Sequence, residues 1–247
     1  EQGTWDSKRV EAVINNSEKR TKHIEDIKRL LLRVDADGIT IDYEEVVGRE
    51  RENFSLFISE LSTRLHENGK FVGVALHPKL GTAEDERFAF QDWLALSKSA
   101  DFLYIMAYGE HYDEGKAGPI ASLPWVSNII DTIERENIPK QKVILGIPLY
   151  GYDWNKDTGD AAVGLTYQDV QRLIRRFNPT LRFDETRASA YFMYEDAGEE
   201  HEVWYEDIRS VEAKVALAKR SGLGGITFWR LGGEDERVWE MVKQINR

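Results

Sequence analysis

The chain has 247 residues and a net charge of -11, which is enough for one domain of barrel size with a sizeable core. Its acidic balance argues against nucleic acid as a partner, because phosphates select basic surfaces. Charges interrupt every apolar run well before the roughly 18 residues of a membrane-spanning helix. The polar amino terminus does not resemble a secretory signal. We therefore expect no membrane partner.

The residues that usually hold metals are sparse in this sequence. There is no cysteine, which excludes a disulfide framework, a thiolate nucleophile and a cysteine zinc site. The five histidines form no HxxxH or HxH pair. We expect neither a metal nor a cofactor.

The most informative stretch is Asp37-Gly38-Ile39-Thr40-Ile41-Asp42-Tyr43-Glu44. We predict that residues 37–44 form a buried strand with an apolar face and a face that carries Thr40, Asp42 and Glu44. Two neighbouring carboxyl groups whose pKa values are pushed apart can hold a proton donor beside an ionised partner, as general acid catalysis requires. An edge strand with a wet polar face fits the same spacing.

Helical patterns flank this strand. Residues 5–33 predict two helices, or one that is broken at Asn15-Asn16-Ser17. A further helix is expected from about Glu50 to Asn68, and Gly69 marks its end. Its inward stripe is predicted to consist of Phe54, Leu56, Phe57, Leu61 and Leu65.

Short apolar strands then alternate with helices. This order is typical of a parallel α/β sheet or barrel. The predicted strands are residues 71–78, 101–108, 143–150 and 225–229, and the predicted helices are residues 93–98, 125–137 and 211–221.

The alternation is interrupted between residues 151 and 207. A helix at 167–177 is followed by two alternating segments, 188–194 and 202–205, which Asp196-Ala197-Gly198 separates as in a hairpin. We therefore divide the chain into a barrel portion (1–150), a small α+β insertion (151–207) and a last helix and strand with a C-terminal helix (208–247).

Four segments together resemble family 18 of the glycoside hydrolases, the chitinase-like family. Residues 37–44 resemble its DGxxxDxE signature at the end of the fourth barrel strand. Met106-Ala107-Tyr108 is similar to the end of the sixth strand, residues 146–151 to the seventh and residues 224–229 to the eighth. The resemblance covers nearly the whole chain and is strongest to the bacterial spore-cortex-lytic and spore-germination branch. It implies an α/β fold, a (β/α)8 TIM barrel of which this chain holds strands 4 to 8, with the insertion between strands 7 and 8.

The resemblance also implies roles for individual residues. Glu44 would be the general acid, Asp42 would orient the acetamido group of the substrate, and Tyr108 would hydrogen-bond that group. The acetamido oxygen of the substrate would itself act as nucleophile. Trp229 would support a pyranose ring on its indole face. The other predicted substrate contacts are Thr40, Glu110, Tyr150 and His77.

Two positions depart from the family pattern. Thr40 stands where the family commonly has Asp or Asn, so Asp42 lacks a like charge and is expected to ionise more readily. Gly109 stands where the family usually has an aspartate, which makes Glu110 the nearest carboxylate. We expect Trp125, Trp154 and Trp204 to be packing residues.

The predicted activity is hydrolysis of β-linked N-acetylglucosamine glycans, either spore cortex peptidoglycan or chitin-type oligomers, by a retaining, substrate-assisted mechanism. The alternative is a catalytically impaired carbohydrate-binding or structural spore-coat member of the family. The expected partner is an N-acetylglucosamine-containing polysaccharide, in an extracellular, spore-associated or cell-wall-associated location. Because the first three strand-helix units of a barrel have no counterpart here, we expect that they were removed or that a second chain supplies them.

Overall fold

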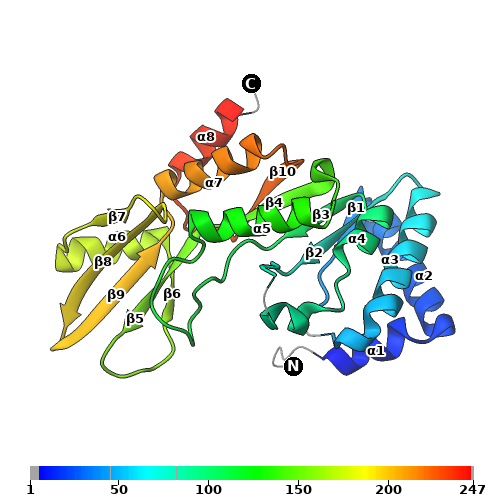
Figure 1. The fold of residues 1–247 in the computed structure, drawn as a ribbon, viewed down its shortest axis with the longest axis horizontal. Coiled ribbons are helices and arrows are strands. Elements are labelled where there is room, and N and C mark those ends of the chain that lie inside the picture. Colours follow the sequence, from blue (N-terminus) through cyan, green and yellow to red (C-terminus); the bar gives the residue numbers. More distant parts are fainter. Residues whose placement is uncertain (1–5, 45, 82, 246–247) are drawn as a thin grey trace. The chain divides into compact units, whose positions relative to one another are not determined.

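The computed structural model describes residues 6–44, 46–81 and 83–245, and the chain divides into two compact units (Figure 1). The first unit is Glu1–Met106 with Asp131–Ile144, and the second is Ala107–Ile130 with Leu145–Arg247. Helix α5 (Leu123–Arg135) and strand β4 (Val143–Pro148) each have residues in both units.

The first unit begins with two helices, α1 (Ser7–Ile14) and α2 (Ser17–Val34). The predicted break at residues 15–17 is confirmed. The side chain of Asn16 accepts a hydrogen bond from the Lys19 amide at 3.0 Å and so caps the start of α2. The helix ends at Asp35, whose φ of 51° lies in the left-handed region.

Three parallel strands follow in the order β1 (Gly38–Ile41), β2 (Phe71–Leu76) and β3 (Phe102–Ile105). Gly73 of β2 leaves room for the neighbouring side chains. A Cβ atom there would lie 2.4 Å from the Tyr104 ring and 3.0 Å from Thr40 Oγ1. The glycine therefore lets a tyrosine and a threonine from different elements approach over the middle strand.

The predicted strands are too long at their ends. Residues 37–44 are not one buried strand, since β1 stops at Ile41 and both Thr40 and Asp42 are exposed. The strands predicted to end at 78, 108 and 150 end at 76, 105 and 148. The strand-like residue pattern continues beyond the last residue that pairs with a neighbouring strand. The pattern therefore cannot locate the last hydrogen bond between the strands.

Helix α3 (Arg51–His66) follows a short 3-10 turn, η1 (Gly48–Glu50), and its end before Gly69 is confirmed by a φ of 66° at that glycine. The predicted inward position of Leu56 is wrong, because this side chain is exposed. Ile58 is fully buried instead, beside the correctly predicted Phe54, Phe57, Leu61 and Leu65. The remaining short elements are η2 (Ala83–Phe88), α4 (Trp93–Ser99) and η3 (Lys140–Lys142).

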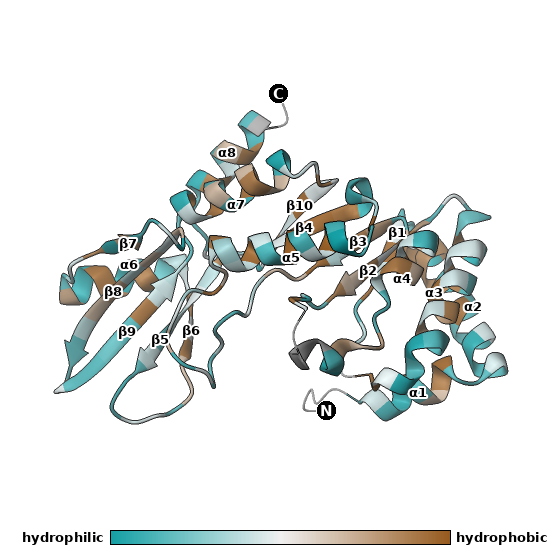
Figure 2. Cartoon of the chain, in the orientation of Figure 1, coloured by the Kyte–Doolittle hydropathy of each residue, from teal (hydrophilic) through white to brown (hydrophobic). Residues whose placement is uncertain are grey.

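The second unit contains an antiparallel sheet in the order β6-β5-β9-β8-β7. The predicted hairpin is confirmed. Ala197 and Gly198 both have positive φ (54° and 89°), as a primed two-residue turn requires. Figure 2 shows the outer ends of the hairpin strands as hydrophilic. The strands are β5 (Tyr150–Asn155), β6 (Val163–Thr166), β7 (Arg182–Asp184), β8 (Ser189–Asp196) and β9 (Glu199–Tyr205).

Strand β5 is absent from the sequence-based prediction. Tyr150 does not end β4 but begins β5, which pairs with both β6 and β9. The intervening residue Leu149 donates its amide to the carbonyl oxygen of Trp229 at 2.7 Å.

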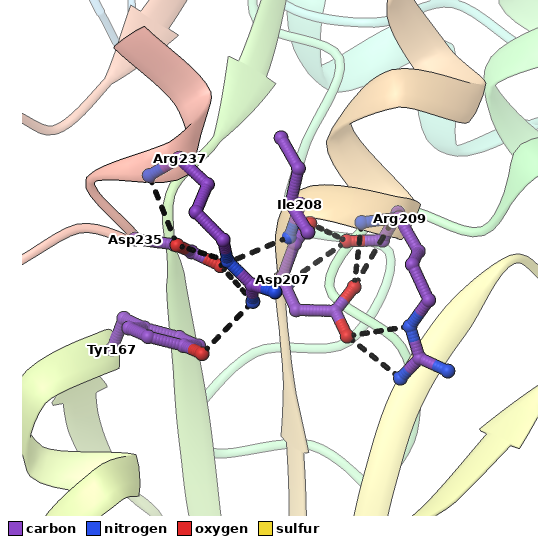
Figure 3. A network of polar contacts seen from close by, with 7 residues as sticks. Tyr167, Asp207, Ile208, Arg209, Asp235 and Arg237 are labelled. Carbon is purple, nitrogen blue, oxygen red and sulfur yellow. Dashed lines mark hydrogen bonds and ion pairs between the residues drawn. The ribbon is translucent and has the colours of Figure 1, made fainter. Parts of the chain in front are cut away.

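A network of charged side chains joins the starts of three helices in the second unit, α6 (Tyr167–Phe177), α7 (Ile208–Arg220) and α8 (Arg237–Ile245) (Figure 3). Asp207 caps α7 by accepting the amides of Arg209 and Ser210 at 3.0 and 3.1 Å. Asp235 binds the guanidinium of Arg237, which also donates to the Tyr167 hydroxyl at 3.1 Å. Strand β10 (Gly225–Trp229) lies next to β4. No helix in the described ranges is both long and apolar enough to span a bilayer.

Candidate active site

The candidate residues fall into two groups, one in each unit. In the first unit, Asp42 and Glu44 follow the C-terminal end of β1, and His77 follows the C-terminal end of β2. Because the strands are parallel with Ile41 opposite Val74, Glu44 and His77 are equally far from that pair and emerge at the same edge of the sheet. This is the edge at which parallel α/β folds place their sites.

The Asp42 carboxyl group has an unusual electrostatic setting. It is exposed, yet the protein packed around it removes enough water to raise the pKa of Asp42 above its ordinary value. No charge in the described residues contributes to this shift. From the sequence, we expect Asp42 to ionise more readily beside Thr40 than it would beside an aspartate at position 40. This expectation stays a prediction. Glu44 is half-buried two residues further on.

His77 is held in place by its backbone and its ring. Its amide donates to the Gln91 side chain at 2.8 Å, and its ring stacks on Phe88 with a centroid distance of 3.8 Å. Burial, with a smaller contribution from the charge of Arg87, lowers the pKa of His77 to about 4. Within residues 6–44, 46–81 and 83–245, Nε2 is buried and has no hydrogen-bond partner. His77 is therefore a neutral imidazole at pH 7.

The group in the second unit surrounds a pocket of about 280 Å³. Tyr150 and Trp229 both line it, and Trp229 is 55% exposed. The Tyr108 ring meets the Tyr150 ring edge-on at 6.4 Å. Burial raises the pKa of Tyr150 well above its usual range, so its hydroxyl stays protonated. The other lining residues are Leu149, Tyr152, Gly164, Leu165, Thr166, Asp169, Arg230 and Gly232.

This pocket contains a carboxylate that the sequence does not predict. Asp169 forms a capping box with Thr166 at the start of α6 and also pairs with Arg172. The Thr166 hydrogen bond, followed by the Arg172 charge, keeps the pKa of Asp169 below its ordinary value. Asp169 is thus an ionised acceptor at pH 7. The neighbouring Gly233 has a φ of 81°, and a Cβ atom there would come within 2.8 Å of Thr166.

Glu110 already has partners of its own. Its carboxylate accepts hydrogen bonds from the Ser122 amide at 2.6 Å and from the Ser122 hydroxyl at 2.9 Å. The Ser122 carbonyl oxygen, just before α5, accepts the Val126 amide. Glu110 therefore stabilises the start of α5, and its predicted contact with substrate stays a prediction.

Two tryptophans behave as expected. Trp154 and Trp204 are each only 5% exposed and form a cluster with Ile120. Tyr108 and Tyr150 pack against this cluster, so the buried indoles support the aromatic side chains that lie next to the pocket. Trp125 is half-buried on α5.

Tyr152 and Tyr43 are not among the site residues that the sequence predicts. Tyr152 lines the pocket, and its ring meets Tyr150 at 5.6 Å. The alternation Tyr150-Gly151-Tyr152 could have revealed it, because residues two apart share a strand face. Tyr43 lies between the two candidate carboxylates, but its partner His23 is twenty residues away and no local pattern connects them.

The side chains of the described ranges contain no cluster of three or more His, Cys, Asp or Glu residues arranged to hold a metal ion.

Comparison with known proteins gives a consistent result. The family model described as glycosyl hydrolases family 18 matches residues 3–234. A cortical fragment-lytic enzyme of Bacillus anthracis is 28% identical over 98% of this chain, and this chain covers 57% of that protein. It thus spans little more than half the length of that relative.

Solved structures agree with the sequence match. The Bacillus cereus spore cortex-lytic enzyme SleL superposes with a TM-score of 0.92 at 27% identity, over 99% of this chain and 57% of that one. A chitinase from Chromobacterium violaceum gives a TM-score of 0.89 at 34% identity, over 98% and 75%. The α/β fold is therefore the chitinase-like one, and the chain belongs to family 18 of the glycosyl hydrolases.

Proposed function

We propose that this protein hydrolyses β-linked N-acetylglucosamine glycans and that Glu44 is the general acid. The observation that carries the proposal is the family signature at residues 37–44, whose two carboxylates follow the C-terminal end of β1, as at the sites of parallel α/β enzymes. The raised pKa of Asp42 supports it, because a shifted carboxyl group is a frequent mark of a catalytic site.

The proposed chemistry is a retaining, substrate-assisted displacement. The acetamido carbonyl oxygen of the substrate attacks the anomeric carbon, and the glycosidic C–O bond breaks. Protonated Glu44 gives its proton to the departing oxygen, while Asp42 holds the acetamido N–H and balances the developing positive charge. Water then opens the cyclic intermediate and returns a proton to Glu44.

Substrate recognition is assigned to the aromatic side chains. Tyr108 would hydrogen-bond the acetamido group. The exposed indole of Trp229 would support one pyranose face beside Tyr150 and Tyr152. Thr40, Glu110 and His77 are the remaining proposed contacts. His77 would act as a neutral imidazole because of its low pKa.

Cortex-type peptidoglycan is the proposed natural substrate, and chitin oligomers are the second choice. The Bacillus anthracis relative is a cortical fragment-lytic enzyme, and SleL of Bacillus cereus is a spore cortex-lytic enzyme. The location that goes with this substrate is the spore or cell wall. We further propose that β1, β2, β3, β4 and β10 correspond to strands 4 to 8 of the family barrel.

A second chain that completes the barrel stays a prediction. Size-exclusion chromatography with light scattering tests it. A complex of at least two chains is expected, and a well-folded monomer of 28.5 kDa would contradict it.

Hydrolysis of N-acetylglucosamine tetramers, followed by chromatography of the products, tests the function. Because this substrate has no activated leaving group, its cleavage requires the proton donor. We expect Glu44→Gln to lower kcat by about 10²- to 10⁴-fold. Glu212→Gln on the exposed face of α7 is the matched control. Equal rates for the parent and Glu44→Gln would remove the catalytic assignment.

The same assay separates the mechanism from the alternative functions. A fully deacetylated oligomer should not be cleaved, because it lacks the nucleophilic carbonyl oxygen. NMR should show the β-anomer as the first product. Binding without turnover would indicate a carbohydrate-binding protein, and neither binding nor turnover would indicate a structural member of the family.

A further inference from the structure

Tyr43 lies between the two candidate carboxylates, but its side chain packs into the helical layer of the first unit. Its ring stacks on Phe57 of α3 at 5.7 Å with an interplanar angle of 9°. It also meets Phe54 at 6.3 Å. Both phenylalanines are fully buried. The ring is therefore held by the core on the side of α3.

The Tyr43 hydroxyl is held from the side of α2. It lies 2.6 Å from Nε2 of His23, and the His23 ring stacks on the same Phe57 at 5.8 Å. Tyrosine, histidine and phenylalanine thus form one compact group from three elements. The hydrogen bond fixes the direction in which the Tyr43 side chain points, whereas apolar packing alone fixes only how deeply the ring is buried.

Both members of this pair stay uncharged near neutral pH. Burial lowers the pKa of His23. The charges of two α2 residues have smaller effects, since Asp26 raises this pKa and Lys22 lowers it. Burial raises the pKa of Tyr43 to about 12. The hydrogen bond is consequently between neutral groups, and either ring nitrogen tautomer of His23 allows it.

Apolar packing anchors the segment after β1 on both sides of Tyr43. Ile41 before it and Val46 after it are buried at 3% and 1% exposure, but both are apolar and give no directional contact. Asp42 is exposed and Glu44 is half-buried. Tyr43 therefore combines a buried ring contact with a directional hydrogen bond at the position between the two carboxyl groups.

We propose that the hydrogen bond between His23 and Tyr43 is a positioning device that sets the orientation of Asp42 and Glu44. This proposal rests on the proposed function for its kinetic consequence. Displacement of a catalytic group by about 1 Å can cost roughly 10²-fold in rate. Neither residue touches the reacting atoms, so both act through the two carboxylates.

Kinetics of four variants on the N-acetylglucosamine tetramer test this assignment. Tyr43→Phe and His23→Leu each remove the hydrogen bond, and each should lower kcat by about tenfold while KM changes less than about twofold. His23→Gln keeps a polar group in place of Nε2 and should recover most of kcat. The double variant Tyr43→Phe with His23→Leu should be no slower than either single variant, because one interaction is lost in all three.

The matched control is Tyr194→Phe. Tyr194 makes a tyrosine hydrogen bond of the same length, 2.6 Å, to Asp153 in the antiparallel sheet of the second unit. Its loss should lower the melting temperature about as much as Tyr43→Phe does, without a change in kcat. A general loss of stability would slow both variants alike, whereas a positioning role slows only Tyr43→Phe.

A measurement that does not need turnover separates this proposal from the proposed function. In two-dimensional amide NMR spectra, His23→Leu should shift the signals of Asp42 and Glu44, and His23→Gln should move them back toward the parent. Unchanged signals in His23→Leu would overturn the positioning role even if the enzyme is active. A parent without turnover whose signals shift as described would sink the hydrolase proposal alone.

Discussion

The buried carboxyl groups near the helix starts of the second unit and Asp42 of the first unit have different electrostatic surroundings. In the second unit, Glu206 and Lys214 form an ion pair at 2.8 Å with both side chains only 1% exposed, and Asp207 and Asp235 each bind a neighbouring arginine. In the first unit, desolvation raises the pKa of Asp42, and among the described residues no cation offsets it. A carboxylate with a fixed cationic partner stabilises the fold, while one without such a partner keeps its proton equilibrium free for chemistry.

The pKa values of Asp235 and Asp42 illustrate this contrast, because the first is lowered and the second is raised. Burial works to raise the pKa of Asp235, but the hydrogen bonds and charge of Arg237 outweigh burial, and the net pKa is lowered. At Asp42, no charge or hydrogen bond from the described part of the chain opposes the effect of desolvation. In Glu206 desolvation exceeds the effect of Lys214, so its pKa is raised even though it is paired.

The largest expected effect comes from breaking the buried ion pair. Lys214→Met leaves the Glu206 carboxylate buried without its cation and should lower the free energy of unfolding by about 3–5 kcal/mol. Urea unfolding followed by circular dichroism measures it. The double variant Lys214→Met with Glu206→Leu should regain most of the loss. A loss below about 1 kcal/mol in the single variant would show that the pair does not determine the stability of this unit.

The second largest effect is expected for Asp42→Asn in the first unit, which should change activity and stability in opposite directions. Asp42→Asn should lower kcat by about 10²- to 10³-fold, because a charge that is placed for the transition state is removed. The same substitution should raise the stability of the fold at pH 7. A folded-state pKa raised above the unfolded value gives stability that is present below the unfolded pKa and is lost as the pH rises through the folded pKa.

The asparagine variant should therefore unfold at a slightly higher temperature than the parent at pH 7 and at the same temperature near pH 3. Thermal melts at the two pH values measure the difference. A lower melting temperature at pH 7 would show that the Asp42 carboxylate is a stabilising group, like those of the second unit.

A smaller effect is expected at the Asp235 network. Arg237→Met should cost roughly 1 kcal/mol at pH 7, since the arginine is largely exposed and solvent weakens its contribution. Because the pKa of Asp235 is lowered in the fold, its stabilisation is present above the unfolded pKa of about 3.9 and is lost as the pH falls through the folded pKa. Urea unfolding should show the parent and the variant converging below about pH 4. A gap that stays constant with pH would assign the loss to packing.

The smallest effect is expected at Leu56 on α3. Leu56→Ala should change the free energy of unfolding by no more than about 0.5 kcal/mol because the side chain is 45% exposed. Leu61→Ala on the same helix removes a fully buried side chain and should cost about 2–5 kcal/mol. Equal losses would place Leu56 in the core stripe, as the sequence periodicity predicts.

Much of the fold could be predicted because its signals are local. The break between α1 and α2, the start and end of α6 and the hairpin turn at Ala197-Gly198 all follow from capping residues, periodicity and positive-φ positions within a few residues. The strand β5 escapes prediction because only Leu149 separates it from β4, and because its own residues, which include Asp153 and Asn155, do not form an apolar run like that of β4.

Some residues of the candidate site also have local sequence signals, and others do not. The positions of Asp42 and Glu44 could be read from a motif of eight residues, and Trp229 and Tyr108 from their places at strand ends. Asp169 and Tyr152 could not be assigned in this way, because they line the pocket only after β5, β6 and α6 have packed. The hydrogen bonds between Glu110 and Ser122 could not be predicted either, because no local pattern connects two residues that lie twelve positions apart.

The sequence by itself determined the family signature, the alternation of strands and helices and the identity of the candidate acid. The tertiary structure alone decided where β1 stops, which helix face is buried and which carboxylates have cations. It also paired Tyr43 with His23. The physical reason is that periodicity and capping act over a few residues, whereas burial and hydrogen bonding join residues that are distant along the chain, and these contacts set both pKa values and the orientation of side chains.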